Sequence, residues 1–168
     1  MSQGVSAQKI LNKIKELQFN HVLMIPDSES RLLYESIEKD TSIELITPCR
    51  EGESIAIAAG LWTGGASPLV VIQNTGLMEA GDSLRGCGMG PRVPLRMIIG
   101  WRGYGNAMSN KLPIDSAYTY TEPLLNGWGI PYWHLMNDSD LEAMDKMDKT
   151  AEETSMPAAV ITGYTFKQ

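Results

Sequence analysis

The sequence predicts an α/β fold: a doubly wound, mainly parallel sheet of six strands with helices on both faces. Short apolar runs alternate along the chain with segments whose apolar residues recur at helical spacing. Runs such as Pro68–Ile72 are apolar without interruption, which is typical of parallel strands buried on both faces. The 168 residues suffice for one hydrophobic core, and no linker or repeat interrupts them, so residues 1–168 are expected to form a single domain.

The first half of the chain is expected to open with a helix and then to alternate strands with helices. Ser6 is a candidate N-cap for the first helix, and Ser28 is a candidate N-cap for the second. Pro26 ends the first apolar run and separates a strand from the second helix. The expected elements are a helix over 6–17, a strand over 21–25, a helix after 28, a strand over 43–47 and a helix from 51 to a stop at Gly64–Gly65.

The second half continues the alternation. Thr75–Gly76 turns the third strand into a helix that runs through Leu84. Clustered glycines and prolines predict a loop over 86–94, and a Gly- and Asn-rich composition predicts a long loop over 101–113. The expected elements are strands over 68–74, 94–100, 130–135 and 157–162, and helices over 75–84, 117–126 (ended by Gly127 and Gly129) and 138–154.

Composition argues against several classes of function. A net charge of −6 without a basic stripe argues against a nucleic-acid partner. No apolar run reaches transmembrane length, and the first residues are polar and lack a secretory hydrophobic segment. Cys49 and Cys87 form neither a CxxC motif nor a zinc-ligand spacing. We therefore expect a cytoplasmic protein with reduced cysteines, no membrane contact and no metal ligands of its own.

Polar or glycine-bearing junctions follow four of the predicted strands, at Pro26–Ser28, Arg50–Glu51, Gln73–Gly76 and Gly100–Gly105. The carboxyl ends of parallel strands meet at one edge of the sheet, where open α/β sheets bind their ligands. The sequence contains no GxGxxG fingerprint after the first strand and no GxxxxGK[ST] motif, so it predicts no phosphate cradle. A Ser-His-Asp triad is disfavoured because no histidine follows a strand near a candidate serine.

Glu51 is the main candidate at this edge. It stands where a strand passes into a helix, and the helix dipole stabilises a carboxylate there. Its alternative role, shared with Glu53, is that of a first-turn acid that only stabilises the helix. Beside the amides of Gln73 and Asn74, a partly desolvated carboxylate can hold or move a proton on a nitrogen heterocycle. For the two amides, the alternative is turn formation before Gly76.

Four motifs, in this order and at this spacing, resemble the pyrimidine-binding domain of thiamine-diphosphate-dependent decarboxylases. They are Pro26-Asp27-Ser28, Arg50-Glu51-Gly52-Glu53 with Ala58-Ala59-Gly60, Gln73-Asn74-Thr75-Gly76-Leu77, and Ile98-Ile99-Gly100-Trp101-Arg102-Gly103. The resemblance extends from about residue 6 to residue 163. Within the family it points first to sulfopyruvate decarboxylase α subunits and next to phosphonopyruvate decarboxylases.

The resemblance implies roles for individual residues. Glu51, nine residues before Gly60, matches the glutamate that hydrogen-bonds N1′ of the cofactor's aminopyrimidine, with Glu53 as a supporting acid. A sulfonate or phosphonate on the substrate favours arginine donors. The implied cofactor-binding residues are Glu51, Gln73, Asn74 and Pro26, and the implied substrate-binding residues are Asp27, Ser28, Arg102 and Arg85, with Arg92 as a further candidate.

The diphosphate and magnesium motif of the family, a Gly-Asp-Gly followed by paired asparagines, is absent from this chain, and Gly81-Asp82-Ser83 does not match it. The resemblance therefore implies a hetero-oligomer in which a β subunit holds Mg²⁺ and the diphosphate end of thiamine diphosphate. The implied reaction is decarboxylation of a small anionic 2-oxo acid.

Among the possible substrates, the resemblance favours sulfopyruvate, which would yield sulfoacetaldehyde and CO2. The reason is that residues 101–116 lack the histidine-containing element that phosphonopyruvate decarboxylases tend to carry. Two alternatives stay open: a split decarboxylase for phosphonopyruvate or another small 2-oxo acid, and a non-catalytic, flavodoxin-like binding or scaffold module.

Overall fold

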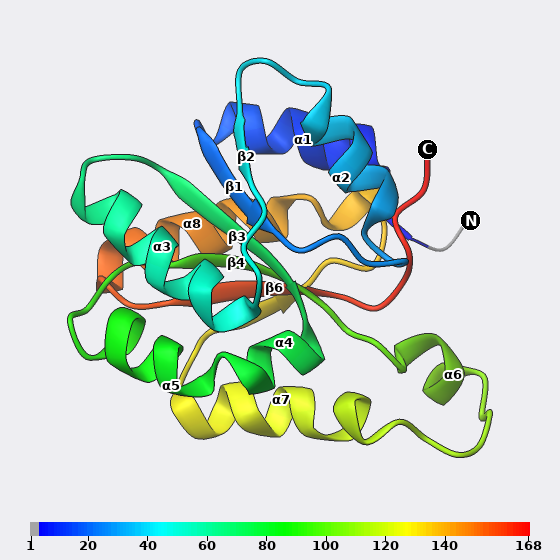
Figure 1. Ribbon diagram of the computed structural model, residues 1–168. Coiled ribbons are helices and arrows are strands. Elements are labelled where there is room, and N and C mark those ends of the chain that lie inside the picture. The colour runs from blue at the N-terminus through cyan, green and yellow to red at the C-terminus, as the bar shows by residue number, and fades with distance from the viewer. Residues whose placement is uncertain (1–3) are drawn as a thin grey trace.

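A computed structural model describes residues 4–168, so the first residues of the predicted domain 1–168 lie outside the described part. Six strands form one sheet, in the order β2-β1-β3-β4-β6-β5, and every neighbouring pair is parallel (Figure 1). The strand order reverses direction between β1 and β3, which confirms the predicted doubly wound α/β class. The strands are β1 (His21–Met24), β2 (Glu44–Ile46), β3 (Pro68–Gln73), β4 (Arg96–Gly100), β5 (Tyr132–His134) and β6 (Ala158–Thr162).

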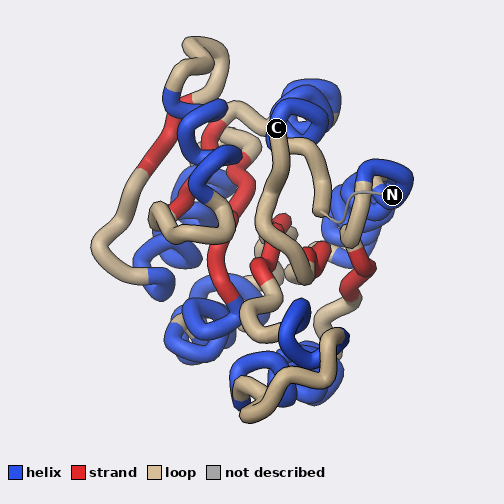
Figure 2. Tube along the Cα trace, turned by 90° about the vertical axis from the view of Figure 1, so that its right-hand side faces the viewer, coloured by secondary structure: helices blue, strands red, loops and turns tan. Residues whose placement is uncertain are grey.

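Helices cover both faces of this sheet, as Figure 2 shows from the side. The buried side chains of α1, α2 and α8 join one apolar cluster, and those of α3, α4, η1 and α7 join a second cluster on the other face. The α-helices are α1 (Ala7–Glu16), α2 (Arg31–Glu38), α3 (Glu51–Thr63), α4 (Asn74–Glu79), α5 (Gly81–Ser83), α6 (Tyr104–Met108), α7 (Ser116–Trp128) and α8 (Glu142–Thr154), with a π-helix η1 (Leu84–Met89) and a 3-10 helix η2 (Asp138–Asp140).

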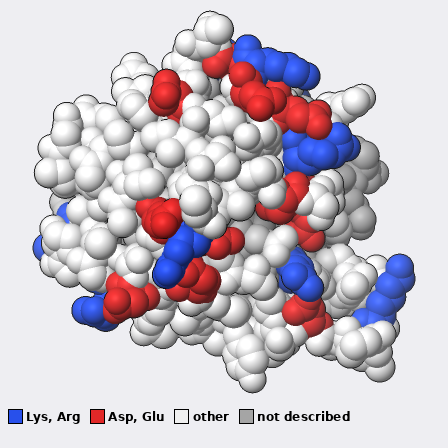
Figure 3. Space-filling view, in the orientation of Figure 1, with Lys and Arg blue, Asp and Glu red and all other residues white. Residues whose placement is uncertain are grey.

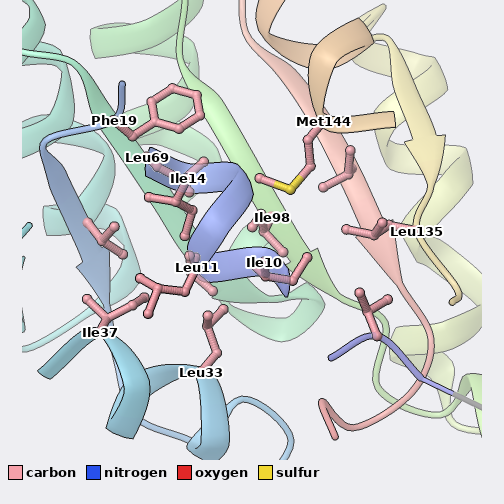
Figure 4. Close-up of a cluster of buried hydrophobic side chains, with 14 of the residues drawn as sticks. Ile10, Leu11, Ile14, Phe19, Leu33, Ile37, Leu69, Ile98, Leu135 and Met144 are labelled. Carbon is pink, nitrogen blue, oxygen red and sulfur yellow. The ribbon is translucent and has the colours of Figure 1, made fainter. Parts of the chain in front are cut away.

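The central strands supply both clusters because their side chains alternate between the faces. In β3, Leu69 and Val71 join the cluster under α1 and α8, whereas Val70 and Ile72 join the cluster under α3. Figure 4 shows the first cluster, in which Ile10 and Ile14 of α1 are among the apolar side chains. Burial on both faces explains why these strands read as unbroken apolar runs in the sequence.

Two segments that the sequence predicts as loops contain helical structure. The first part of the predicted loop 86–94 belongs to η1, and α6 lies within the predicted loop 101–113. Gly88 serves close packing rather than a turn, because a Cβ there would lie 2.8 Å from Leu95 Cδ1. Gly103 does take a left-handed conformation, with φ of 92°, and precedes α6 as its N-cap. Glycines with different physical roles therefore look alike in the sequence.

Two predicted helix ends are also wrong. The second helix begins at Arg31 rather than after Ser28, because Asp27 Oδ1 accepts the N–H groups of Glu29 and Ser30 and folds the chain into a turn first. Helix α7 passes through Gly127 and ends at Gly129, whose φ of 67° stops it.

None of the described helices is both long and apolar enough to cross a membrane. Cys49 and Cys87 are free thiols. On the face shown in Figure 3, acidic and basic side chains are interspersed, so that face shows no basic stripe.

Candidate functional site

The carboxyl edge of the sheet gathers the predicted junctions. Gln73, Gly100 and Thr162 are register neighbours at the ends of β3, β4 and β6. The loop that begins at Pro26 follows β1, which pairs with β3 on its other side. Glu51 reaches the same region from α3, because its side chain lies against Gly76 just after β3. The structure therefore brings together residues of all four predicted junctions.

The carboxylate of Glu51 is positioned by packing against Gly76 rather than by hydrogen bonds. A Cβ built on Gly76 would lie 2.6 Å from Glu51 Oε1, so only glycine at 76 leaves room for this side chain. Within residues 4–168, no group donates a hydrogen bond to the half-buried Glu51 carboxylate. Its oxygens are therefore available to a ligand or to another chain.

The neighbouring acids hold the start of α3. Glu53 Oε2 accepts the N–H of Cys49 at 3.0 Å. Glu79 Oε2 accepts the N–H of Gly52 at 2.8 Å, while Glu79 Oε1 forms an ion pair with Arg50 Nη2 at 2.7 Å. Of the two acids in the first turn, Glu53 thus bonds the main chain just before the helix, and Glu51 makes no such bond. Sequence reasoning missed Glu79, since nothing in its local sequence signals a partner so far back in the chain.

The two predicted amides have different surroundings. Gln73 is half-buried at the edge, and its Oε1 accepts a hydrogen bond from Thr75 Oγ1 at 3.0 Å. Asn74 is fully buried, and its Nδ2 donates to Thr121 Oγ1 at 3.0 Å and to the carbonyl of Arg102 at 3.2 Å. Asn74 Oδ1 also accepts the N–H of Thr75. The structure therefore places Asn74 beneath the edge, where it joins α7 to the segment after β4.

The loop after β1 contributes one residue that the sequence analysis did not single out. Pro26 and Ser28 are exposed, and Asp27 is half-buried as the acceptor of its own turn. Glu29 is also half-buried and accepts a hydrogen bond from the Gln73 side chain. Burial raises the pKa of the Glu29 carboxyl, and the nearby charge of Asp27 raises it further. The only sequence signal was its place in a strand-end loop.

The candidate arginines are spread over the molecule. Arg102 follows β4 at the carboxyl edge, and its Nε lies 3.1 Å from Asp115 Oδ2. Arg85 lies further along the helical layer, in η1, and forms an exposed ion pair with Asp82 at 2.6 Å. Arg92 precedes β4 at the opposite edge of the sheet and donates to the carbonyl of Thr154. Of these three, Arg102 is the arginine whose charge acts on Glu29 at the carboxyl edge.

Aromatic rings support the segment that carries Arg102. Trp101 is buried and stacks on Tyr118 with ring centroids 5.1 Å apart, and its Nε1 donates to the Tyr118 carbonyl. On another side Trp101 stacks on His134 at 5.8 Å. These contacts fix the end of β4 against α7 and β5.

In residues 4–168, no three or more His, Cys, Asp or Glu side chains are grouped so that they could hold a metal ion. Asp27 and Asp115 at the carboxyl edge instead form their own separate hydrogen bonds, and the Glu51 carboxylate accepts none within residues 4–168.

No family model matches the chain. Curated relatives do match it. A sulfopyruvate decarboxylase subunit alpha from Methanothermobacter thermautotrophicus is 23% identical over 163 residues, which cover 96% of this chain and 97% of that subunit. The subunit alpha from Methanococcus maripaludis is 23% identical over 161 residues, with 93% of each chain covered. The chain resembles sulfopyruvate decarboxylase α subunits.

Longer relatives match over part of their length. A sulfopyruvate decarboxylase from Methanosarcina acetivorans is 25% identical over 152 residues, or 89% of this chain. A phosphonopyruvate decarboxylase from Streptomyces hygroscopicus is 31% identical over 99 residues, or 59% of this chain. The chain covers only 38% of the first protein and 25% of the second. The chain therefore matches less than half of the length of these two relatives.

Proposed function

We propose that the chain is the α subunit of a heteromeric, thiamine-diphosphate-dependent decarboxylase that converts sulfopyruvate to sulfoacetaldehyde and CO2. The resemblance to separate α subunits over nearly their whole length supports this assignment. The observation that carries it is the Glu51 carboxylate, which lies on Gly76 at the carboxyl edge without a hydrogen-bond donor from residues 4–168.

The residues present fit one end of the cofactor. Glu51 would accept a hydrogen bond from N1′ of the aminopyrimidine and share a proton with it, with Gln73 and the Pro26 loop beside the ring. The glycine at 76 leaves the space that the Glu51 side chain occupies, and packing against this glycine would orient the carboxylate for this contact. When bound, thiamine diphosphate supplies the electron sink for the loss of CO2.

We assign the diphosphate end and Mg²⁺ to a β subunit, since residues 4–168 offer no grouped metal ligands. The outer face of α3 supports such a partner. Ile57 and Trp62 are 37% and 36% exposed there, and α3 has no charged residue after Glu53. The surface over the middle of α3 is accordingly uncharged in Figure 3. Helices that are apolar on all sides are typically buried, so this face suits an interface next to Glu51.

Arg102 is the proposed partner for the substrate's sulfonate. It uses Nε for Asp115, which leaves its terminal nitrogens for an anion. Asp27 and Ser28 lie in the loop after β1 and would contact the rest of the substrate. Arg85 has no part in this arrangement, because it lies in η1 with Asp82. The free thiols and the small charged substrate fit the expected cytoplasmic location.

The test is to assemble the chain with its β subunit, thiamine diphosphate and Mg²⁺, and to measure CO2 release from sulfopyruvate. Glu51→Gln should lower kcat by about 100-fold, a typical loss for a proton-transferring group. Glu53→Gln, which changes a capping acid only, is the matched control and should keep most of the activity. Full activity of the Glu51→Gln assembly would contradict the assigned role.

The same assay decides the substrate. The match to a phosphonopyruvate decarboxylase favours phosphonopyruvate as the second candidate. A higher kcat/KM for phosphonopyruvate would replace sulfopyruvate in the assignment. An assembly that binds no thiamine diphosphate would favour the non-catalytic module instead.

A further inference from the structure

The proposed reaction consumes a proton, and this inference rests on that proposed function. A 2-oxo acid carboxylate and one H⁺ give an aldehyde and CO2: the C–C bond to the carboxylate breaks, and a C–H bond forms at the same carbon. Glu51 is already assigned to the cofactor's ring nitrogen. The reaction therefore needs a proton donor other than Glu51, and the carboxyl edge of the sheet offers further carboxyl groups.

Two carboxylates at this edge are occupied by structural hydrogen bonds. Asp27 Oδ1 accepts two main-chain N–H groups, at 2.7 and 2.9 Å. Asp115 Oδ1 accepts the N–H of Ala117 at 2.9 Å as the N-cap of α7, and its Oδ2 pairs with Arg102. Each of these bonds uses the carboxylate as an acceptor. Glu29 differs, because its carboxyl caps no turn or helix in residues 4–168.

Glu29 also lies where solvent-accessible space meets the interior. It lines an open crevice of about 200 Å³ together with Gly103, Asn106 and Tyr164. It lines a second, internal cavity of about 10 Å³ that reaches Ser30 and Thr162. A substrate or solvent could reach Glu29 from the crevice, and the internal cavity also borders Glu29.

The internal cavity has the chemistry of a water site. Ser30 Oγ and Thr162 Oγ1 are both buried and have no hydrogen-bond partner among residues 4–168. Leaving a buried hydroxyl without a hydrogen bond is energetically unfavourable, and such groups are rare in folded proteins. A cavity of this size is about large enough for one water molecule. Both residues line this cavity, so a water bound in it is the candidate partner for their hydroxyls.

We propose that Glu29 is the acid that delivers the proton to the substrate carbon from which CO2 has left, with one water bound behind it between Ser30 and Thr162. The proton leaves the Glu29 carboxyl and forms the new C–H bond, whose electron pair is that of the broken C–C bond. The resulting Glu29 carboxylate regains a proton from solvent through the crevice. Gln73 positions the carboxyl, since its Oε1 is fixed by Thr75 and its side chain donates to Glu29.

The groups around Glu29 are consistent with this role. Asp27 faces it from the same loop, and Tyr164 faces it from the segment after β6. Arg102 approaches from the segment after β4, and Asp115 from the start of α7. Burial is the largest cause that raises the pKa of Glu29, and the charge of Asp27 is the next; Arg102 and the hydrogen bond from Gln73 lower this pKa, and Asp115 raises it. A carboxyl with this environment keeps its proton at higher pH than an ordinary glutamate does.

The first test uses the full chain and no assay of activity. In the chain labelled with ¹³C-carboxyl glutamate, one NMR resonance should be absent from Glu29→Gln and should titrate with a midpoint above the usual 4.5. A midpoint at or below 4.5 would overturn the proposal. A crystal structure should show one water within hydrogen-bond distance of Ser30 Oγ and Thr162 Oγ1, and an empty cavity would overturn that part.

The second test uses the assembly with the β subunit. Glu29→Gln should lower kcat about 100-fold with KM changed less than about 3-fold, and Glu29→Asp should restore part of the activity. In Glu29→Gln, one CO2 per site should appear in a burst before slow aldehyde formation. Glu38→Gln, an exposed acid of α2, is the matched control and should behave as wild type.

Two failures can be told apart. An active wild type with an equally active Glu29→Gln overturns only the role of Glu29. A wild-type assembly that releases no CO2 overturns the proposed function, and the role of Glu29 with it.

Discussion

Glu51 lies directly against the main chain of Gly76, so closely that a methyl group at 76 would come within 2.6 Å of Glu51 Oε1. The two residues belong to different helices, α3 and α4, that follow different strands. The contact therefore joins two of the strand-end junctions and fixes the position of the one acid that α3 does not use for its own stability.

Gly76→Ala should displace Glu51. Alanine in place of a helical glycine normally stabilises a protein by up to about 1 kcal/mol, but here the added methyl group has no room. We expect kcat of the assembled enzyme to fall about 100-fold, because small displacements of a reacting group are costly. Activity and thermal unfolding together check this. Gly127→Ala in α7 is the control, since a Cβ there meets nothing within 4 Å, and it should lose no activity.

Glu79→Ala should loosen the start of α3. The change removes both the acceptor for the Gly52 N–H and the partner of Arg50, and Gly52 is buried. We expect the free energy of unfolding to fall by about 1–2 kcal/mol, from urea titrations. Glu153→Ala removes only an exposed pair with Lys149 and should cost less than about 0.5 kcal/mol. Equal losses in the two variants would show that Glu79 has no special role.

Arg96→Ala should be the most destabilising of these changes. The Arg96 side chain is 8% exposed and pairs with Asp148 at 2.9 Å and with Glu152 at 2.7 Å. Removing it leaves these two carboxylates facing each other, and we expect a loss of about 3 kcal/mol in chemical unfolding. Arg31→Ala, whose side chain is 65% exposed, should cost less than about 0.5 kcal/mol. A similar, small loss for Arg96→Ala would contradict the prediction.

The contributions of Glu29 and Asp40 to the free energy of unfolding should change with pH in opposite directions. The pKa of Glu29 is raised in the folded chain, so its contribution is complete below the unfolded pKa near 4.5 and is lost as pH rises through the folded pKa. Relative to Glu29→Gln, the wild type should therefore lose stability between pH 4.5 and neutrality. Thermal unfolding of both proteins across this range measures the difference.

Asp40 provides the control of opposite sign. Hydrogen bonds from Lys15 and Ser42 lower the pKa of Asp40 from 3.8 to about 2. Its contribution is therefore present above pH 3.8 and lost as pH falls towards 2. Relative to Asp40→Asn, the wild type should lose stability on acidification. A pH-independent difference for either pair would contradict the corresponding shift.

The sequence predicts the sheet well because strands buried on both faces need uninterrupted runs of apolar residues. The run Pro68–Gln73 is apolar for a physical reason that needs no knowledge of its neighbours. The position of Glu51 at the carboxyl edge could also be predicted, since a strand-to-helix junction has a fixed place in a doubly wound sheet. The clusters of glycines were harder, because Gly88 and Gly103 differ only in what surrounds them in space.

The remainder of the site depends on contacts between distant residues. Asn74 has the same side chain type as a ligand-binding amide, but Thr121 and the Arg102 carbonyl engage it beneath the edge. Glu29 follows two residues that the sequence predicts for the site, yet its proposed role is argued from Gln73 and from a cavity that reaches β6. No local pattern contains such relationships.

The apolar outer face of α3 and the Glu51 carboxylate belong to one short, continuous helix. A helix moves nearly as a rigid body, so a displacement of the exposed side of α3 also displaces its first residue, Glu51. In the proposed assembly, a change in how the β subunit contacts α3 would therefore also change the position of the Glu51 carboxylate. In the proposed assembly, a substitution at Ile57 or Trp62 is therefore expected to change the turnover number through the position of Glu51.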